Sequence, residues 1–223
     1  MRILDARQLE QSPALLDEVI AVLREDRLVC CPGHRQYSIA ASLMSEDAVI
    51  RLVQAKRRSG KAPSLVLIPD VSMLAEVVEQ IPVKAELLLK RFWPGQLTLL
   101  LQPSAELSSK VRKTIAANKP ARVGVRVPAP GLTLDLVHRF GGPLLISSAN
   151  LAAKVGSRSA SNVRKNFNHT VDLMIDAGDI PDATPSTVVE VSGDALRVTR
   201  EGAIPTADIE NALREANAEL SES

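Results

Sequence analysis

Residues 143–150 read Pro-Leu-Leu-Ile-Ser-Ser-Ala-Asn, an apolar run that ends in a small polar cluster. The run 143–146 is typical of a buried strand, because none of its side chains gains from contact with water. The hydroxyls of Ser147 and Ser148 and the amide of Asn150 follow where the strand ends. In an open α/β sheet ligands bind at the carboxyl ends of strands, so this cluster is a candidate site. The same residue types often start turns or cap helices, and the segment alone favours that simpler interpretation.

Other short apolar runs predict the strands on either side of this segment. They lie at 28–31, 64–68, 96–101, 123–127, 171–175, 186–191 and 195–199. Helical spacing of apolar residues predicts helices at 9–23, from Ser45 to about 56, and at 72–91, 132–140 and 206–220. The two strands around Ser192-Gly193-Asp194 predict a hairpin, so the sheet is mixed. We therefore expect an α/β domain over residues 1–205 and a peripheral helical tail over 206–223.

The composition excludes several classes of protein. The 223 residues carry a net charge of +1, so no overall field attracts the chain to nucleic acid or to a membrane surface. Aromatic residues make up 2%, which argues against recognition of single strands by base stacking. The adjacent Cys30 and Cys31 lie in an apolar run and are expected to be buried free thiols. Because the sequence shows neither a signal peptide nor a membrane-spanning run, we expect a cytoplasmic protein without a membrane partner.

The candidate chemistry is that of an anion-binding pocket. His34, His138 and His169 are scattered and the cysteines lack metal-ligand spacing, so neither a nucleophilic triad nor a metal held by the protein is expected. The basic run 56–61 is either a solvated charged surface or a place where Lys and Arg bind a polyphosphate. Arg126 interrupts an apolar strand and is expected to reach a carboxylate or a ligand.

Six motifs, taken in order, resemble one family. They are Lys-x-Arg at 56–58, Phe-Trp-Pro-Gly-Gln-Leu-Thr at 92–98, Val-Arg-Val-Pro at 125–128, Ser-Ser-Ala-Asn at 147–150, Pro-Ser-Thr-Val-Val at 185–189 and Arg-Glu-Gly at 200–202. Together they are similar to the YrdC/TsaC-type threonylcarbamoyl-AMP synthase family over roughly residues 9–204. The short form of that family, without its extra C-terminal domain, fits the length of this chain.

The resemblance implies a fold and a reaction. The fold is a twisted mixed sheet with flanking helices and a concave, positively charged face. The reaction joins L-threonine, bicarbonate and ATP to give threonylcarbamoyl-AMP and pyrophosphate, for threonylcarbamoyladenosine modification of tRNA. A divalent ion such as Mg²⁺ commonly accompanies the nucleotide in such transfers. The implied partners are these substrates, with RNA and the components of a separate tRNA transferase as further candidates.

The resemblance also assigns roles to residues. Four would hold phosphates and complete the catalytic site: Lys56, Arg58, Ser148 and Asn150. Two more would contact the nucleotide, namely Ser186 and Arg200. Two would recognise threonine: Arg126 would pair with the threonine carboxylate and Tyr37 would line the pocket.

One segment departs from the family pattern. Residues 32–38 read Pro-Gly-His-Arg-Gln-Tyr-Ser where the family has a Pro-Thr-x-Thr-x-Tyr-Gly-like segment. Both threonines are lost, and Arg35 adds a charge that would fill the gap or bind a different acid. This departure keeps two alternatives open. One is a relative that binds nucleotide or RNA without synthase activity, similar to the YciO-like branch; the other is a pure RNA-binding protein, whose affinity would fall steeply with salt.

Overall fold

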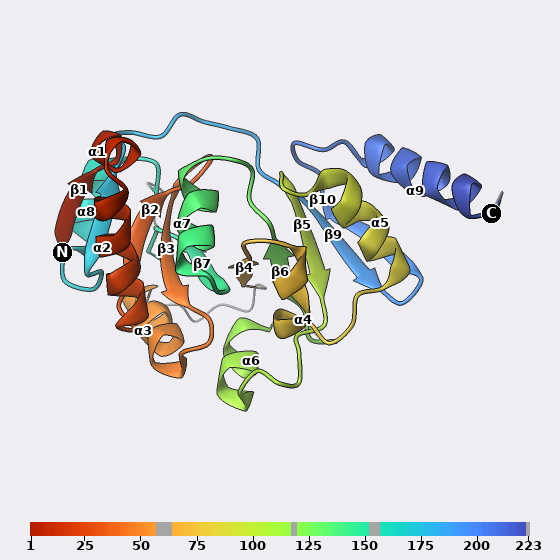
Figure 1. Ribbon diagram of the computed structural model, residues 1–223, viewed down its shortest axis with the longest axis horizontal. Coiled ribbons are helices and arrows are strands. Elements are labelled where there is room, and N and C mark those ends of the chain that lie inside the picture. The colour runs from red at the N-terminus through yellow and green to blue at the C-terminus, as the bar shows by residue number, and fades with distance from the viewer. Residues whose placement is uncertain (57–63, 117–119, 152–156, 222–223) are drawn as a thin grey trace.

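The computed structural model contains a ten-stranded mixed sheet with helices packed against it (Figure 1). It describes residues 1–56, 64–116, 120–151 and 157–221. The strands are β1 (Arg2–Asp5), β2 (Val29–Pro32), β3 (Tyr37–Ser42), β4 (Leu65–Leu67), β5 (Leu97–Leu101), β6 (Val123–Arg126), β7 (Leu144–Ser148), β8 (Leu173–Asp176), β9 (Thr187–Ser192) and β10 (Ala195–Arg200). The helices are α1 (Ala6–Gln11), α2 (Pro13–Arg24), α3 (Glu46–Lys56), α4 (Leu74–Val77), α5 (Val83–Phe92), α6 (Ser109–Ile115), α7 (Leu132–Phe140), α8 (Ala160–Phe167) and α9 (Thr206–Ser221), with a 3₁₀ turn at Val71–Met73.

The strand order is β1-β8-β2-β3-β7-β4-β6-β5-β9-β10, which confirms the predicted α/β fold with a mixed sheet. The predicted hairpin is confirmed too, since β9 and β10 pair antiparallel. Gly193 lies in its turn with a φ of 56°, a conformation that glycine adopts without strain.

Strand β7, which carries the opening segment, lies near the middle of the sheet. It pairs antiparallel with both of its neighbours, β3 and β4. The rule that ligands gather at the carboxyl ends of parallel strands therefore does not apply to it directly. Its end at Ser148 lies beside the beginning of β3, where Ser38 is its register partner.

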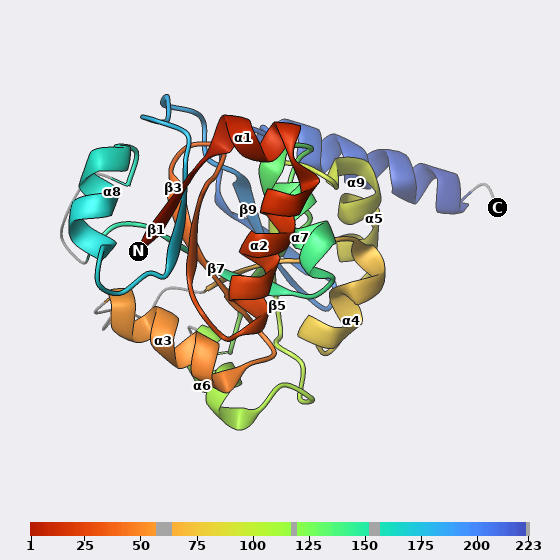
Figure 2. The ribbon, with the colours of Figure 1, turned by 60° about the vertical axis from the view of Figure 1, so that its left-hand side comes forward.

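The core has two parts. The smaller contains Val19, Ile20 and Leu23 of α2 together with Leu136 and Val137 of α7. The larger includes residues of α3, α5, α6 and α8. Helices α2 and α8 accordingly lie on opposite faces of the sheet, as Figures 1 and 2 show.

Proline explains two differences from the expected helices. The predicted helix at 9–23 divides into α1 and α2, because Pro13 begins α2 and has no amide hydrogen with which to continue α1. The predicted helix at 72–91 is likewise divided, with Pro82 at the N-cap of α5. Between the parts, Val78 forms an isolated bridge with Pro103.

The C-terminal helix α9 begins against the rest of the chain. Ile209 is fully buried within the larger part of the core, and Leu213 packs on it. The far end of α9 extends beyond the other elements in Figure 1. The division into a domain over 1–205 and a helical tail over 206–223 stays a prediction.

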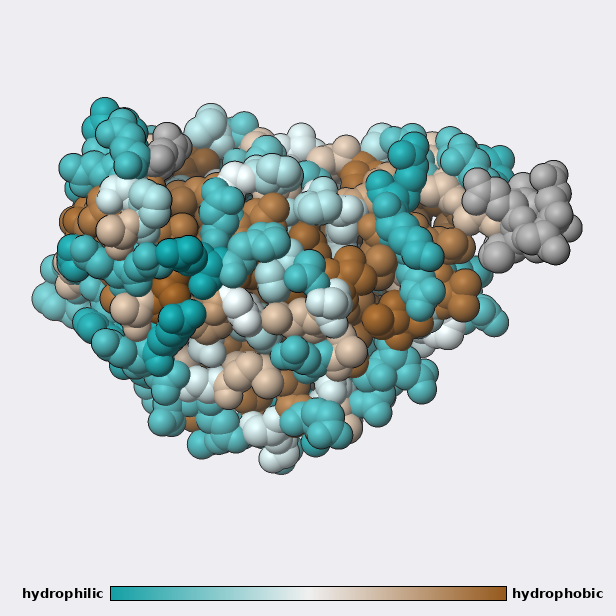
Figure 3. Space-filling view, viewed as in Figure 1, coloured by the Kyte–Doolittle hydropathy of each residue, from teal (hydrophilic) through white to brown (hydrophobic). Residues whose placement is uncertain are grey.

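Both cysteines are buried and free, as expected. No helix among the described residues has the length and apolar character needed to cross a bilayer. The face drawn in Figure 3 mixes polar and apolar surface across most of the elements, in keeping with ordinary composition.

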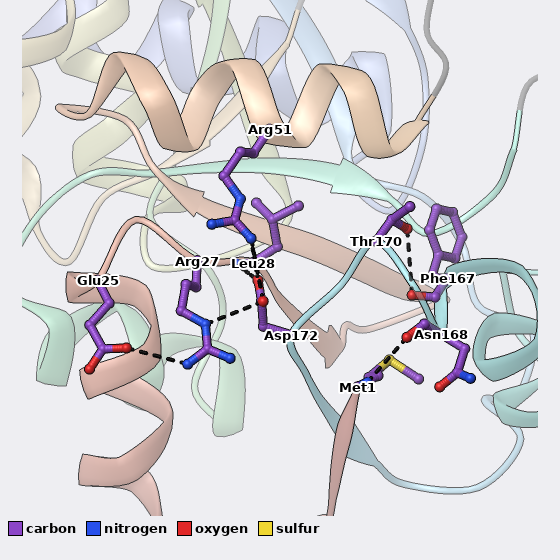
Figure 4. A network of polar contacts seen from close by, with 9 residues as sticks. All are labelled: Met1, Glu25, Arg27, Leu28, Arg51, Phe167, Asn168, Thr170 and Asp172. Carbon is purple, nitrogen blue, oxygen red and sulfur yellow. Dashed lines mark hydrogen bonds and ion pairs between the residues drawn. The ribbon is translucent and has the colours of Figure 1, made fainter.

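A carboxylate ties three elements together at one end of the molecule (Figure 4). Asp172 accepts a hydrogen bond from the backbone N–H of Leu28 at 2.9 Å, just before β2. It also forms ion pairs with Arg27 (3.2 Å) and with Arg51 of α3 (3.0 Å). These contacts join the start of β2, the segment before β8 and helix α3, so the role of this network is structural.

Candidate active site

Lys56 joins the end of α3 to the end of β7. Helix α3 starts at the predicted N-cap, where the Ser45 hydroxyl accepts a hydrogen bond from the Ala48 N–H at 3.1 Å. Its last residue, Lys56, is only 6% exposed. The Lys56 ammonium donates to the backbone carbonyls of Ser148 and Asn150, the latter at 2.7 Å, and to the Asn150 Oδ1 at 3.0 Å. A buried positive charge is thereby fixed beside the polar cluster.

Ser148 and Asn150 are fixed by the same contacts. The Ser148 hydroxyl donates to Asn150 Oδ1 at 2.7 Å. Between them, the Ala149 N–H donates to the Tyr37 carbonyl at 2.8 Å, which continues the pairing with β3. We call Lys56, Ser148 and Asn150 the β7 cluster. The structure thus brings together three of the four predicted catalytic residues, and the fourth, Arg58, lies outside the described residues.

Ser186 and Arg200 meet where β9 begins and β10 ends. The Arg200 guanidinium donates from Nη2 to the Ser186 carbonyl at 2.8 Å and to the Ser186 hydroxyl at 3.1 Å. The hydroxyl of Thr98 on β5 lies 3.0 Å from that of Ser186. Backbone approach is close here, because a Cβ on Gly202 would lie 2.2 Å from the Pro185 carbonyl oxygen. Only glycine at 202 lets the two segments pack in this way.

Arg126 ends β6 near this pair. Its Nη1 lies 3.5 Å from the Oε1 of Gln96, and its buried Nε has no hydrogen-bond partner within residues 1–56, 64–116, 120–151 and 157–221. Burial and the nearby charge of Arg200 lower the pKa of Arg126 to about 10. Arg126 is therefore a cation held in a site that lacks a compensating charge.

Arg35 lies close to this region from the other half of the sheet. It stands in the loop between β2 and β3, and its Nε is also buried, without a partner in the described part of the chain. Burial, and then the charge of Arg35, lower the pKa of Arg200. We call Arg35, Arg126 and Arg200 the arginine cluster. None of the three forms a salt bridge with a carboxylate in the part of the chain that the structure describes.

Tyr37 is expected to line the threonine pocket, and that role stays a prediction. Its side chain is fully buried. The hydroxyl donates to the Gly178 carbonyl at 2.6 Å and accepts from the Ala177 N–H at 2.9 Å. Burial raises the pKa of Tyr37 to about 12. Tyr37 begins β3, which lies between β2 and β7, and its ring packs in the core, where it anchors the loop that carries Arg35.

The β7 cluster and the arginine cluster lie at different levels of the sheet along the direction of its strands. Leu67 of β4 is the register partner of both Leu144 and Arg126. Arg126 is thus level with the start of β7, whereas Ser148 ends that strand. The loop of residues 33–36 connects the clusters: Tyr37 pairs with Ala149, and the charge of Arg35 acts on Arg200.

Two polar side chains of this region were not assigned a role from the sequence. Gln96 contacts Arg126, and Thr98 contacts Ser186. Both belong to the segment 92–98 that carried the family resemblance. A lone hydroxyl in the apolar run of β5 was the signal that could have identified Thr98.

Metal ligands are not gathered in the same way. Across residues 1–56, 64–116, 120–151 and 157–221, no group of three or more His, Cys, Asp or Glu side chains could hold a metal ion. The polar groups that do converge are cations, hydroxyls and amides, which suit anionic ligands rather than cations.

Comparison with known proteins gives a consistent picture. Residues 21–202 match the family model for Sua5, YciO and YrdC proteins, described as telomere recombination. The chain is 33% identical over 193 residues to the threonylcarbamoyl-AMP synthase of Pyrococcus abyssi, covering 86% of this chain and 55% of that protein. It is 32% identical over 205 residues to the Bacillus subtilis threonylcarbamoyl-AMP synthase, covering 91% and 58%. The chain thus spans little more than half the length of these relatives.

Solved structures agree with the sequence matches. The crystal structure of P. abyssi Sua5 complexed with L-threonine superposes with a TM-score of 0.78 at 30% identity, over 89% of this chain and 57% of that one. E. coli YciO superposes with a TM-score of 0.75 over 89% of this chain and 94% of that one, at 22% identity. The likeness to YciO concerns the fold alone.

Proposed function

Since this chain belongs to the Sua5/YciO/YrdC family, we propose that it is a threonylcarbamoyl-AMP synthase. The reaction has two steps. The amine nitrogen of L-threonine first forms a bond to the carbon of bicarbonate, water leaves, and a carbamate results. A carbamate oxygen then forms a bond to the α-phosphorus of ATP, and the bond from that phosphorus to pyrophosphate breaks. Two relatives above 30% identity bear this name, and one related structure contains L-threonine.

The observation that carries the proposal is the pair of clusters. Phosphoryl-type transfer depends on positioning and on stabilising negative charge, and it needs no nucleophilic side chain. The buried ammonium of Lys56 and the fixed hydroxyl of Ser148 supply charge and a hydrogen bond at one end of the site. The guanidinium groups of Arg126 and Arg200 supply charge at the other.

We propose for these residues the roles that the family resemblance implies. Lys56, Arg58, Ser148 and Asn150 would hold the phosphates, and Ser186 and Arg200 would contact the nucleotide. Arg126 would bind the threonine carboxylate through a two-pronged guanidinium contact. Mg²⁺ would arrive bound to the ATP phosphates, as part of the substrate. Transfer of the product to tRNA would fall to a separate protein assembly, and the cytoplasm is the compartment we propose.

A second candidate is a nucleotide- or RNA-binding relative without synthase activity. It is favoured by the segment 32–38, which has lost both threonines of the family pattern, and by the burial of the Tyr37 side chain. A pure RNA-binding protein ranks third, because the net charge is close to zero.

Release of pyrophosphate from ATP tests the proposal. The purified protein is expected to release it only when both L-threonine and bicarbonate are present. Lys56→Ala should lower this rate, because a buried charge beside the phosphates is lost, whereas Lys90→Ala on the exposed surface of α5 should not. ATP binding without threonine-dependent release would favour the second candidate. Equal rates for the wild type and Lys56→Ala would overturn the assignment of Lys56.

A further inference from the structure

Two guanidinium groups of the site have buried nitrogen atoms with no hydrogen-bond partner among the residues that the structure describes. They are the Nε atoms of Arg35 and Arg126. A buried N–H group without an acceptor is costly, and folded proteins normally satisfy it. The third member of the arginine cluster differs, since Arg200 uses Nε and Nη2 on the Ser186 carbonyl. The unsatisfied donors therefore belong to Arg35 and Arg126 in particular.

The charge of Arg200 interacts with the charges of both other arginines. Its charge lowers the pKa of Arg126, and the charge of Arg35 lowers the pKa of Arg200. Like charges held together in this way destabilise the empty site. A ligand with two negative groups would relieve the repulsion and satisfy the free donors on both sides of Arg200.

The fold holds Arg35 in position. The loop closes on itself through a hydrogen bond of 3.0 Å from the Gly33 N–H to the Gln36 carbonyl. Gln36 accepts from the Ser157 hydroxyl at 3.0 Å, and the Tyr37 N–H donates to the Ser157 carbonyl at 2.7 Å. A Cβ on Gly33 would lie 3.0 Å from the Gln36 carbonyl oxygen, so a residue with a side chain fits this turn poorly. Arg35 thus lies on a closed turn with anchors on either side.

The charge of the proposed reaction intermediate matches these two arginines. Threonine itself carries one carboxylate. Once its amine has reacted with bicarbonate, the molecule carries two, the α-carboxylate and the carbamate. Each carboxylate is a planar acceptor for one guanidinium fork made of Nε and Nη.

We propose that Arg35 binds the carbamate group, and hence the bicarbonate-derived carboxylate, while Arg126 binds the α-carboxylate of the same molecule. The inference rests on the proposed function and extends it to Arg35, where this chain departs from the family's Pro-Thr-x-Thr-x-Tyr-Gly-like segment. Arg35 is a substrate-contacting residue in this scheme. In solution a carbamate loses carbon dioxide. Arg35 would hold the carbamate until a carbamate oxygen attacks the α-phosphorus of ATP.

Steady-state kinetics with each substrate varied in turn tests the assignment. In Arg35→Met the KM for bicarbonate should rise about 10- to 100-fold, the worth of one charge-assisted fork, while the KM for ATP and for threonine changes less than about twofold. Arg35→Lys keeps the positive charge but not the two-pronged guanidinium contact, so its KM for bicarbonate should lie between those of the wild type and Arg35→Met. Arg91→Met on the exposed surface of α5 is the matched control and should leave all three values unchanged.

A rise in the KM for ATP in Arg35→Met would place Arg35 on the phosphates and overturn the inference. Unchanged kinetics would overturn it as well. Absence of threonine- and bicarbonate-dependent pyrophosphate release in the wild type would instead contradict the proposed function.

Calorimetric binding gives a readout independent of turnover. N-carboxymethyl-L-threonine is a stable compound with two carboxylates that imitates the carbamate. The wild type should bind it at least about tenfold more tightly than L-threonine, and Arg35→Met should lose this preference while still binding L-threonine. Equal affinity of the wild type for the two compounds would overturn the inference whether or not the protein is active.

Discussion

Two sets of arginines in this protein differ in their partners. Arg27 and Arg51 pair with Asp172, and the buried Arg122 bonds Glu190 at 3.0 Å. The arginine cluster has no carboxylate partner within the described ranges. Paired arginines join elements of the fold, whereas we propose that Arg35 and Arg126 direct their free donors to a ligand. Changes in the two groups should therefore affect different properties: stability in the first and substrate binding in the second.

The largest effect is expected from the same substitution made in each group. Arg126→Met should lower kcat/KM for threonine about 100-fold or more, because the contact to the carboxylate is lost. Its free energy of unfolding should stay equal or rise, because repulsion from Arg200 is removed. Arg122→Met should do the reverse, destabilising the fold with KM values preserved. Pyrophosphate release and urea denaturation measure the two properties, and a stability loss in Arg126→Met would erase the distinction.

Glu190→Gln tests the paired arginines by removing the charge of a carboxylate partner. Arg122 is only 4% exposed, so the loss of its charged partner should destabilise the fold by about 3 kcal/mol at pH 7. The hydrogen bond from Arg197, followed by the charge of Arg122, holds the pKa of Glu190 below its ordinary 4.5. This stabilisation is present above pH 4.5 and is lost as the pH falls through the lower folded pKa. Urea midpoints of the wild type and the variant should converge as the pH is lowered below 4.5.

A smaller effect is expected at Asp172, because Arg27 and Arg51 are more than 40% exposed and water screens their charges. Asp172→Asn should lower the free energy of unfolding by about 1–2 kcal/mol, mainly through weaker bonds to the Leu28 N–H and the two guanidinium groups. Chemical denaturation measures the change. The KM values for all three substrates should stay the same, and a change in any of them would show that the network of Figure 4 influences the site.

Local patterns were enough to predict most of the fold, and the family resemblance predicted the β7 cluster. Each of the eight strand segments expected from apolar runs overlaps a strand, and the motifs bring Lys56, Ser148 and Asn150 together as expected. Strand β3 was missed because Tyr-Ser-Ile-Ala-Ala-Ser has few β-branched residues and becomes a strand by pairing with β2 and β7 on both sides. Pairing with strands that are distant in the sequence produces no periodic pattern of apolar residues from which a strand could be predicted.

The arginine cluster shows where sequence reasoning stops. Arg35, Arg126 and Arg200 are far apart in the chain, and no spacing rule relates a loop residue to the ends of β6 and β10. The sequence also could not show which arginines have carboxylate partners. Which arginines have such partners depends on how the strands are arranged in the sheet. Arg122, for example, directly precedes β6 and pairs with Glu190 of β9. The same limit explains Tyr37, whose ring faces the core because of the path of β3.

The neighbouring thiols of β2, Cys30 and Cys31, can each report solvent access to one face of the sheet. Cys30 belongs to the larger part of the core and Cys31 to the smaller, because successive side chains of a strand point to opposite faces. Burial raises the pKa of Cys30 well above normal and that of Cys31 to about 12, so neither thiol is reactive while its layer is closed. Alkylation of each sulfur therefore records how often its own side of the sheet opens to solvent. Unfolding of the two layers can thus be timed separately in the unmodified chain.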